Sequence, residues 1–397
     1  MASVGSMMPD EPRFHGPAFN RAAAMFQEGL LTGLADAGIA VDAVFTLEPM
    51  AAFPGGPRLL GRPGTLTTRM GWTIRLLPYL NFYPLKWLTA GMSAFVALLL
   101  WSWRNRKRTR VIHCVNLTMP PGIFIWLAAR LTGARTIASI LDVFKPGALV
   151  PDTWYRRLDF AMQRRLLPHY DGMMVVADAI AEDLVPGRRV CRIEGGLLPI
   201  HFAKRPPTQP RRAGDAFRVV LSGSLEVYNG VELALRAAAS LPEGYQLLVA
   251  GVGSRTEHVR EYSRRDPRIQ YLGFLDFADV LQLYWSADLL LNVRLTRTVD
   301  TRYFFPSKLM ELLASGTPVL STCTGHVERE YGHVTYLLRE ETPEILASEI
   351  MRIARLPVDQ REALGARARE FMLENKTWQR QGEKLLRYIE AEVLVGR

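Results

Sequence analysis

The segment 302–322, RYFFPSKLMELLASGTPVLST, carries one carboxylate, Glu311, in the second turn of an expected helix. Pro306 and Ser307 stand at the entrance of that helix, and Lys308 occupies its first turn. Free amide groups at a helix entrance bind phosphates, and Lys308 adds a full positive charge. Glu311 lies one turn further along the same face, where a carboxylate can accept two hydrogen bonds from a ribose. The spacing therefore predicts a nucleotide laid along a helix end; the alternative is a Lys–Glu pair on a solvated face.

Alternating strand and helix patterns predict the elements that position this segment. Strands are expected at 2–8, 41–47, 111–117, 135–142 and 171–178, with helices at 17–38, 120–133 and about 153–167. Further strands are expected at 217–223, 245–251, 269–275, 288–294 and 317–322, with helices at 231–241 and 278–287. This alternation predicts an α/β fold with parallel, doubly wound sheets. Ligands of such sheets bind in a crevice at the carboxyl ends of the strands.

Length and composition predict two domains in a reducing compartment. The chain has 397 residues, of which 48% are hydrophobic and 22% charged, enough to bury a sizeable core. Residues 203–216, AKRPPTQPRRAGDA, are Pro- and Arg-rich and predict an interdomain linker between two Rossmann-like halves that face each other across a cleft. The 3 cysteines are scattered and the N-terminus shows no apolar signal segment, so a cytoplasmic protein is expected.

Positive charge is concentrated in the first half of the chain. Residues 1–200 hold 22 Lys and Arg against 14 Asp and Glu, a balance of +8 out of the total of +10. No acidic residue lies between Glu48 and Asp142, whereas 12 basic residues do. A segment of one sign favours an anionic partner such as lipid headgroups or a pyrophosphate. A solvated basic face is the alternative, and nucleic acid is not expected because aromatic residues are not interleaved with the basic run RNRKRTR.

The uncharged segment 87–103, WLTAGMSAFVALLLWSW, directly precedes that basic run. As a helix it would be about 25 Å long, slightly short for a bilayer core of about 30 Å. Three interpretations remain: a core helix, a helix lying in the membrane interface, and a membrane span. The span would divide the α/β pattern between two compartments. The interfacial interpretation predicts a protein held at an anionic membrane surface, peripherally at the inner face of the cytoplasmic membrane.

The run FPSKLMELLASGTPVLST resembles the nucleotide-sugar motif of the family-four retaining GT-B glycosyltransferases. LSGSLEVYNGVELALRAAASL is similar to the start of their donor domain, and LLVAGVGS and YLGFLDFADVLQLYWSADLLLNVR are similar to its next strands. The resemblance extends over nearly the whole chain. It implies a GT-B fold with an acceptor-binding domain at 1–202, a nucleotide-sugar-binding domain at 217–375 and a final helix, 376–397, that crosses back to the first domain.

The resemblance also implies the site residues. The catalytic residues would be Lys308, Glu311 and Asp142. Acceptor-side residues would be His15, Gly16, His113 and Asn116, although a buried core role for His113 is an equal alternative. The nucleotide-sugar site would comprise Gly223, Ser224, Asn229, Gly251, Gly253, Leu275, Arg302, Phe305, Pro306, Ser307, Lys308, Leu309 and Glu311. Gly251-x-Gly253 fits a tight strand-to-helix turn, because Thr256 stands where a dinucleotide motif requires a third glycine.

Several positions depart from the family pattern. The first of two glutamates that many members carry is Tyr303 here, as in a subgroup with PSK before the helix. The usual cations after the first donor-domain strand correspond to Ser224 and Asn229, so Lys308 must compensate, with Arg294, Arg297 or Arg302 as helpers. A histidine common after a first-domain strand corresponds to Leu141. The chain has no Asp-x-Asp motif and its histidines lack metal spacing, so no metal and no cofactor are expected.

The resemblance therefore implies transfer of a sugar from a UDP- or GDP-linked donor with retention of configuration. The acid-free segment and the 87–103 helix favour a lipid-linked acceptor, in polysaccharide or glycolipid assembly. One alternative is a catalytically silent GT-B protein that binds a partner or a sugar nucleotide, because three usual polar positions are altered. Another is a sugar-nucleotide epimerase, which would convert the donor with no acceptor present.

Overall fold

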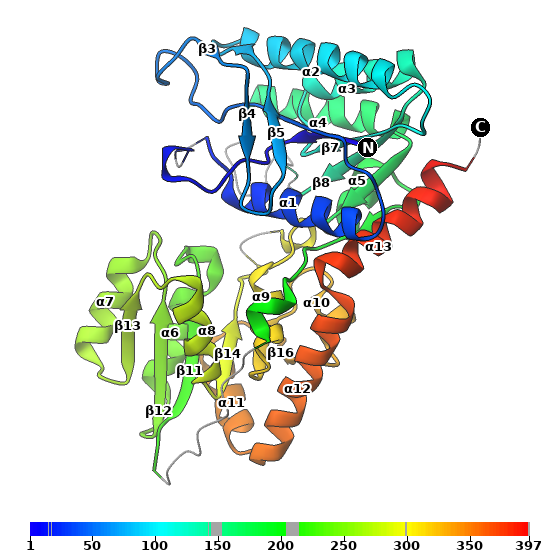
Figure 1. Ribbon diagram of the computed structural model, residues 1–397. Coiled ribbons are helices and arrows are strands. Elements are labelled where there is room, and N and C mark those ends of the chain that lie inside the picture. The colour runs from blue at the N-terminus through cyan, green and yellow to red at the C-terminus, as the bar shows by residue number, and fades with distance from the viewer. Residues whose placement is uncertain are drawn as a thin grey trace. The chain divides into compact units, whose positions relative to one another are not determined.

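A computed structural model describes residues 1–14, 16, 18–141, 143, 153–203, 214–297 and 300–395. The chain forms two compact units, one of Met1–Gly196 with Trp378–Arg397 and one of Leu197–Thr377 (Figure 1). The last helix therefore belongs to the first unit. The unit boundaries differ from those expected at 202 and 375, because Leu197 bridges to Thr377 and its amide donates to the Lys376 carbonyl at 2.9 Å. Of the expected linker, residues 204–213 lie outside the described residues.

The first unit is built on an eight-stranded sheet in the order β10-β9-β8-β7-β1-β2-β5-β4. All neighbouring strands are parallel except β4, which is antiparallel to β5. A separate ribbon pairs β3 with β6 antiparallel. The central strands are almost wholly buried, as their continuous apolar runs predict for a parallel sheet. The strands are β1 Ala2–Gly5, β2 Ala43–Thr46, β3 Leu60–Gly61, β4 Gly64–Thr67, β5 Thr73–Leu76, β6 Tyr79–Leu80, β7 Val111–Val115, β8 Arg135–Ile140, β9 Gly172–Val175 and β10 Cys191–Arg192.

The helices of this unit are α1 Arg21–Asp36, α2 Leu85–Arg104, α3 Pro121–Thr132, α4 Trp154–Leu166, α5 Asp178–Leu184 and α13 Trp378–Tyr388. Asn20 caps α1 by accepting a hydrogen bond from the Ala23 amide. Helices α1 and α13 approach closely, since a Cβ atom at Gly33 would lie 1.9 Å from the Trp378 carbonyl oxygen. The Tyr388 hydroxyl accepts from the amide of Met173 in β9 at 3.0 Å. These contacts tie the C-terminal helix into the first unit.

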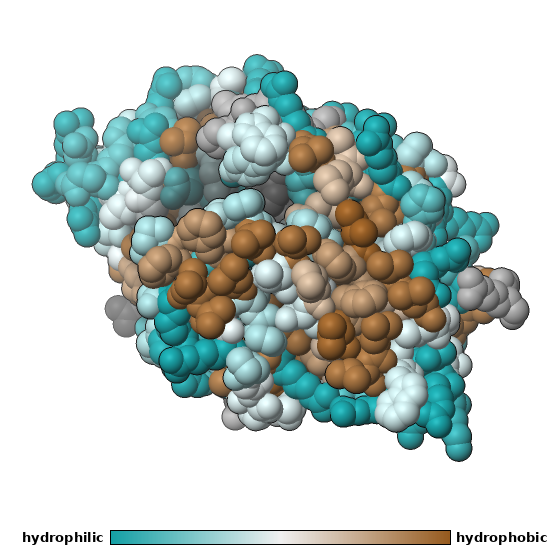
Figure 2. Space-filling view, turned by 90° about the horizontal axis from the view of Figure 1, so that it is seen from above, coloured by the Kyte–Doolittle hydropathy of each residue, from teal (hydrophilic) through white to brown (hydrophobic). Residues whose placement is uncertain are grey.

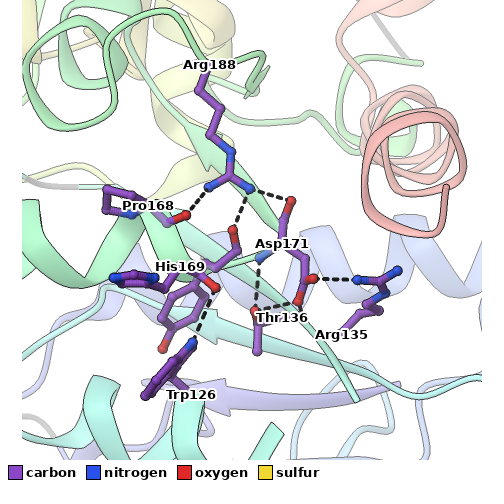
Figure 3. A network of polar contacts seen from close by, with 8 residues as sticks. Trp126, Arg135, Thr136, Pro168, His169, Asp171 and Arg188 are labelled. Carbon is purple, nitrogen blue, oxygen red and sulfur yellow. Dashed lines mark hydrogen bonds and ion pairs between the residues drawn. The ribbon is translucent and has the colours of Figure 1, made fainter. Parts of the chain in front are cut away.

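A polar network joins the amino ends of β8 and β9 to the loop before β10 (Figure 3). The Asp171 carboxylate accepts from Arg135 at 2.7 Å, and from the amide and hydroxyl of Thr136 at 2.8 and 3.0 Å. Arg188 donates to the carbonyl oxygens of Pro168, at 3.1 Å, and of Asp171, at 2.7 Å. Main-chain groups at these loop ends are thereby satisfied by side chains.

The second unit contains a six-stranded, wholly parallel sheet in the order β13-β12-β11-β14-β15-β16. Successive residues of β11 enter different cores, with Val219 and Leu221 in one and Val220 in the other. The sheet is therefore covered by helices on both faces. The strands are β11 Phe217–Ser222, β12 Tyr245–Ala250, β13 Ile269–Gly273, β14 Leu289–Asn292, β15 Val319–Thr322 and β16 Tyr336–Leu338. The helices are α6 Val231–Ser240, α7 Thr256–Arg265, α8 Phe277–Trp285, α9 Lys308–Ser315, α10 Val327–Tyr331, α11 Pro343–Ala354 and α12 Val358–Asn375.

Helix α2 contains the uncharged segment expected at 87–103. It is buried on one face, at residues such as Ala90, Ala94 and Leu98, and exposed on the other. By length and composition alone it is the one described helix that could cross a membrane, and 39% of its most apolar window is buried. The interpretation as a core helix therefore fits one face of α2 only.

Candidate functional site

A pocket of about 170 Å³ lies in the second unit, at the carboxyl ends of β11 and β14. From β11 the chain continues to β12 and β13 on one side, and it returns to β14 on the other. The pocket thus lies where the strand order reverses, which is the usual ligand position in a doubly wound sheet. None of the lining residues is acidic; they are Leu221, Ser222, Gly223, Ser224, Leu225, Asn229, Val231, Leu291, Asn292, Val293, Arg294, Pro306, Ser307 and Lys308. Six of them were predicted to bind the nucleotide sugar.

The loop after β11 forms one wall of the pocket. Gly223 has a φ of +124°, a conformation that favours glycine, and its amide donates to the Ala250 carbonyl at 2.9 Å. The Asn229 amide group donates to the Ser224 carbonyl at 2.8 Å and holds the turn. Gly251 supports this wall from behind, because a Cβ atom there would lie 1.8 Å from the Gly223 carbonyl oxygen.

Helix α9 begins on the opposite wall. Pro306 is buried, Ser307 is exposed and Lys308 is the first helical residue. The next two amides, of Leu309 and Met310, already donate to the carbonyls of Pro306 and Ser307 at 2.8 and 3.1 Å. The side chain of Leu309 is fully buried in the core. The predicted contact of Leu309 with the nucleotide therefore has neither a free amide nor an accessible side chain to make it.

Lys308 stands at the centre of a polar cluster. Its Nζ lies 3.6 Å from Glu311 Oε2 and 5.8 Å from the Tyr284 ring centroid. The Tyr284 hydroxyl is 2.6 Å from the Ser222 hydroxyl, at the end of β11. Burial disfavours the charged ammonium, but Tyr284 and Glu311 outweigh it and raise the pKa of Lys308 above its usual value. Lys308 is therefore cationic at neutral pH and reaches the pocket from a helix entrance.

Arg294 supplies a second cation. It follows β14 and lines the pocket, with its guanidinium 5.7 Å from the ring centroid of Tyr228. Burial lowers the pKa of Arg294 below its usual value, and its interaction with Tyr228 opposes that shift. No carboxylate in the described part of the chain forms an ion pair with it. The sequence analysis expected Arg294, Arg297 or Arg302 to assist Lys308. Arg294 is the one that lines the pocket, because it comes directly after the end of β14.

Other residues expected at the nucleotide sugar lie outside the pocket lining. Arg302 pairs with Asp300, from Nη2 to Oδ2 at 2.8 Å, and is largely exposed. Leu275 packs against the core, and Phe305 stacks on His326 with ring centroids 5.5 Å apart. Gly253 packs against the backbone of residue 225, where a Cβ atom would lie 2.6 Å from the carbonyl carbon and oxygen. Glu311 reaches the pocket only through Lys308, so its contact with a ribose stays a prediction.

The acceptor-side residues that the structure describes, His113, Asn116 and Gly16, have different surroundings. His113 has no exposed surface, and its ring lies between the hydroxyls of Ser3, at 3.2 Å, and Ser139, at 2.6 Å. Its predicted contact with an acceptor is therefore corrected to a core role, because the side chain is enclosed between residues of the neighbouring strands β1 and β8. Burial lowers its pKa to about 4, so the ring is neutral at pH 7.

Asn116 follows β7 in a left-handed conformation, with a φ of +51°. Its Oδ1 accepts from the Leu141 amide at 3.0 Å, so it ties the ends of β7 and β8 together. Gly16 is exposed in a bend. His15 and Asp142, predicted for the acceptor side and for catalysis, lie outside the described residues.

The pocket is built for an anion. Helices α6 and α9 both begin on it, and their amino ends carry partial positive charge. Lys308 and Arg294 add two full charges on a lining without carboxylates. Among the described residues, no group of three His, Cys, Asp or Glu side chains is placed to hold a metal ion. The expectation of a site without a metal stays a prediction.

Comparison with known families matches both units. Residues 227–387 match the model of the glycosyl transferase-like family, and residues 22–196 match the glycosyl transferase 4-like domain. A Salmonella typhimurium protein, named as a glycosyltransferase of colanic acid biosynthesis, is 24% identical over 230 residues. That match covers 52% of this chain and 56% of the relative, so the chain spans little more than half the length of the curated protein it matches.

Solved structures share the fold over the full chain. Sucrose-phosphate synthase from Thermosynechococcus elongatus superposes with a TM-score of 0.65 at 17% identity, covering 98% of both chains. The Anabaena protein HepE in complex with UDP gives 0.64 at 14% identity, covering 98% of this chain and 99% of the other. The lipopolysaccharide outer core galactosyltransferase WaaB gives 0.61 at 12% identity, covering 99% of both. At these identities the likeness establishes the GT-B architecture of two Rossmann-like domains.

Proposed function

Because the chain belongs to the GT-B glycosyltransferases of the family-four type, we propose that it transfers a sugar from a UDP- or GDP-linked donor to a lipid-linked acceptor. The anomeric configuration of the sugar would be retained. The reaction would belong to the assembly of a polysaccharide or glycolipid and would take place at the inner face of the cytoplasmic membrane.

One observation carries the donor half of the proposal. Lys308 and Arg294 meet the amino ends of two helices on a pocket with no acidic lining residue. A diphosphate carries negative charge on both phosphoryl groups and matches this arrangement better than a neutral sugar does. HepE, which shares the fold, has been crystallised with UDP. These findings support a nucleoside diphosphate as the ligand of the pocket.

The same groups would supply the chemistry. As the bond between the sugar carbon and the donor oxygen breaks, negative charge grows on the leaving diphosphate. Lys308, with its raised pKa, and Arg294 are cations placed to stabilise that charge, and they need no reorganisation to do so. The acceptor hydroxyl would attack from the face that the diphosphate leaves, and the diphosphate would accept its proton. This route retains configuration without a protein nucleophile.

Support for the acceptor half comes from the first unit. Twelve basic residues and no acidic one lie between Glu48 and Asp142, and α2 exposes an apolar face. The relatives include proteins named for colanic acid biosynthesis and for the lipopolysaccharide outer core. A lipopolysaccharide is a glycan attached to a lipid, and a lipid-linked acceptor agrees with that name.

Nucleoside diphosphates and their sugars, screened by thermal shift, test the donor assignment. A ligand that binds only the folded state raises the melting temperature by mass action. We expect one base, uracil or guanine, to stabilise the protein selectively. The matched control is Lys308→Gln, which should reduce that stabilisation. Equal stabilisation of both proteins by every nucleotide, or none by any, would contradict the proposed donor site.

A silent binding protein is the second candidate, because Ser224 and Asn229 replace the cations usual after the first donor-domain strand. Incubation of the purified protein with the stabilising sugar nucleotide separates the possibilities. A transferase slowly hydrolyses its donor or transfers the sugar to an added lipid acceptor. A silent protein leaves the donor intact, and an epimerase converts it to a second sugar nucleotide without any acceptor.

A further inference from the structure

The solvent-facing side of α2 is mostly apolar. Its polar residues before Arg104, Thr89 and Ser93, are half-buried, and their hydroxyls hydrogen-bond to the Leu80 amide and the Pro78 carbonyl. Every exposed residue of this helix up to position 103 is apolar, and these six residues, spaced three or four apart, form one line along the helix. We refer to them as the α2 stripe: Leu85, Leu88, Met92, Val96, Leu100 and Trp103. A surface helix of a globular protein normally carries polar residues on this side. The exposed apolar stripe therefore indicates an interaction surface.

The opposite side of α2 is fastened to the first unit. Ala90, Ala94 and Leu98 are buried, and Phe95 meets Phe124 of α3 in an edge-to-face contact with centroids 6.3 Å apart. Near the start of the helix, Lys86 donates to the Met50 carbonyl at 2.6 Å. A membrane span would have to break all of these contacts. The geometry instead allows the stripe to enter a bilayer surface while the other side stays in the protein.

Further apolar residues extend this face. Leu60, Phe82 and Tyr83, at and beside the β3–β6 ribbon, are each about half exposed, and so is Leu131 at the end of α3. Figure 2 shows the face from above, with apolar atoms gathered in its middle and hydrophilic residues at its margins. Tyr83 and Trp103 lie at opposite ends of the stripe. Such amphipathic aromatic rings favour the boundary between lipid tails and headgroups.

The charge beside the stripe matches one kind of partner. Arg104, Arg106, Lys107 and Arg108 follow directly on Trp103, and all four are exposed. The acid-free segment includes the stripe, the ribbon and α3. A convex apolar line bordered by arginines fits an anionic bilayer, which offers acyl chains and phosphates at adjacent depths.

A groove of about 240 Å³ continues the stripe at its C-terminal end. Leu100 lines both the stripe and the groove, and Arg75 of β5 and Arg104 of α2 supply its cations. Asp42 is the carboxylate in the lining of the groove, and its Oδ1 lies 3.8 Å from Nη1 of Arg108. Trp101 also lines the groove, and its indole nitrogen is buried without a hydrogen-bond partner. The groove thus offers two arginines and an apolar floor to a phosphate attached to hydrocarbon.

We propose that the α2 stripe docks the protein on an anionic phospholipid bilayer, with a headgroup phosphate in the groove between Arg75 and Arg104. The helix axis lies in the plane of the membrane and the stripe enters to the depth of the headgroup boundary, about 5–10 Å. This inference rests on the proposed function, because a lipid-linked acceptor is presented at that surface. It assigns the docking to particular side chains and excludes a spanning helix.

Vesicle flotation tests the apolar part. Wild-type protein should bind vesicles of phosphatidylglycerol and phosphatidylcholine, and phosphatidylcholine alone should bind it more weakly. Val96→Glu removes an exposed methyl pair from the stripe and adds a repelling charge, so we expect binding about tenfold weaker or worse. Val358→Glu is the matched control, an exposed helical valine in the second unit. Equal loss in both variants, or no binding by the wild type, overturns the proposal.

Charge variants test the basic part. The triple substitution Arg106→Gln, Lys107→Gln and Arg108→Gln should weaken binding by roughly a hundredfold, about fivefold for each charge removed. Arg75→Gln should weaken binding to phosphatidylglycerol more than binding to phosphatidylcholine, whose choline cation offsets the charge of the same phosphate. Insertion depth follows from quenching of Trp103 fluorescence by brominated lipids, measured as the quenching that is lost in Trp103→Phe. Absence of that difference would show that the stripe stays outside the bilayer.

The same samples separate this inference from the proposed function. Nucleoside diphosphate binding by thermal shift should be unchanged in Val96→Glu, because the pocket lies in the second unit. Donor binding without vesicle binding would overturn the docking surface alone. Vesicle binding without any nucleotide stabilisation would overturn the donor assignment alone.

Discussion

The pocket has two cations, Lys308 and Arg294, and local sequence pattern predicts one of them better than the other. Lys308 belongs to a short motif in which proline, serine and lysine mark a helix entrance, so local pattern is enough to predict it. Arg294 is one of three arginines within nine residues, and local sequence pattern does not indicate which of them lies at the pocket. The end of β14 decides among them, because it brings residue 294 to the carboxyl edge of the sheet beside β11.

Substitution of either cation should weaken donor binding. For Lys308→Gln and for Arg294→Gln we expect the affinity for the preferred nucleoside diphosphate to fall by about 10- to 100-fold, since a charged hydrogen bond contributes about 1.5–3 kcal/mol. Isothermal titration calorimetry measures the change. Arg302→Gln is the control, because Arg302 is exposed and paired with Asp300 away from the pocket lining. A comparable loss in Arg302→Gln would contradict the assignment.

His113 gives the folded protein a pH dependence. Its pKa is about 4 in the fold, because burial disfavours the charged ring, against about 6.5 in the unfolded chain. The unfolded state therefore binds more protons between these values, and stability falls as pH falls through that window. Between pH 7 and pH 5 this group should cost about 2 kcal/mol of unfolding free energy. Urea unfolding at both pH values measures it, and His113→Gln should show a smaller difference than the wild type.

The elements that the sequence predicts best are the buried parallel strands. Continuous apolar runs such as 247–250 and 289–291 favour strands of a sheet that is covered by helices on both faces. The β3–β6 ribbon and strand β4 were not predicted, because they are short and show no apolar alternation. His113 shows what the strand pattern cannot predict. Alternation along a strand determines which residues share a face, but only the packing around that face shows that the His113 side chain is enclosed.

Close packing between two loops should control the shape of the pocket. Gly251→Ala would place a methyl group 1.8 Å from the Gly223 carbonyl oxygen, at a φ of +134°. The Gly223 loop must then move, so we expect both lower stability, by about 2 kcal/mol or more, and weaker nucleotide binding. Gly244→Ala is the control: its φ is +90°, but nothing lies within 4 Å of its added methyl. If both variants behave alike, backbone strain alone is the cause and the loop contact is unimportant.

At the scale of the whole molecule, the last helix determines which unit depends on the C-terminus. Trp378 fills a space left by Gly29 and Gly196, and its ring meets Phe26 edge-on at 5.2 Å. All of these residues belong to the first unit. The pocket proposed to bind the nucleotide, in contrast, lies wholly within residues 197–377. Loss of Trp378 should therefore loosen one unit and leave the donor site in the other.

Hydrogen exchange of tryptophan variants measures this division. In Trp378→Ala, which removes about 3 kcal/mol of packing, exchange should accelerate in β1, α1 and α13, while nucleoside diphosphate affinity is retained. Trp285→Ala is the reciprocal variant, because Trp285 packs in the second unit and donates to the Ser315 carbonyl at 3.1 Å. It should accelerate exchange around α8 and α9 and weaken nucleotide binding. Acceleration of both units by both variants would mean that they unfold together, and the C-terminal helix would then be a determinant of the entire fold.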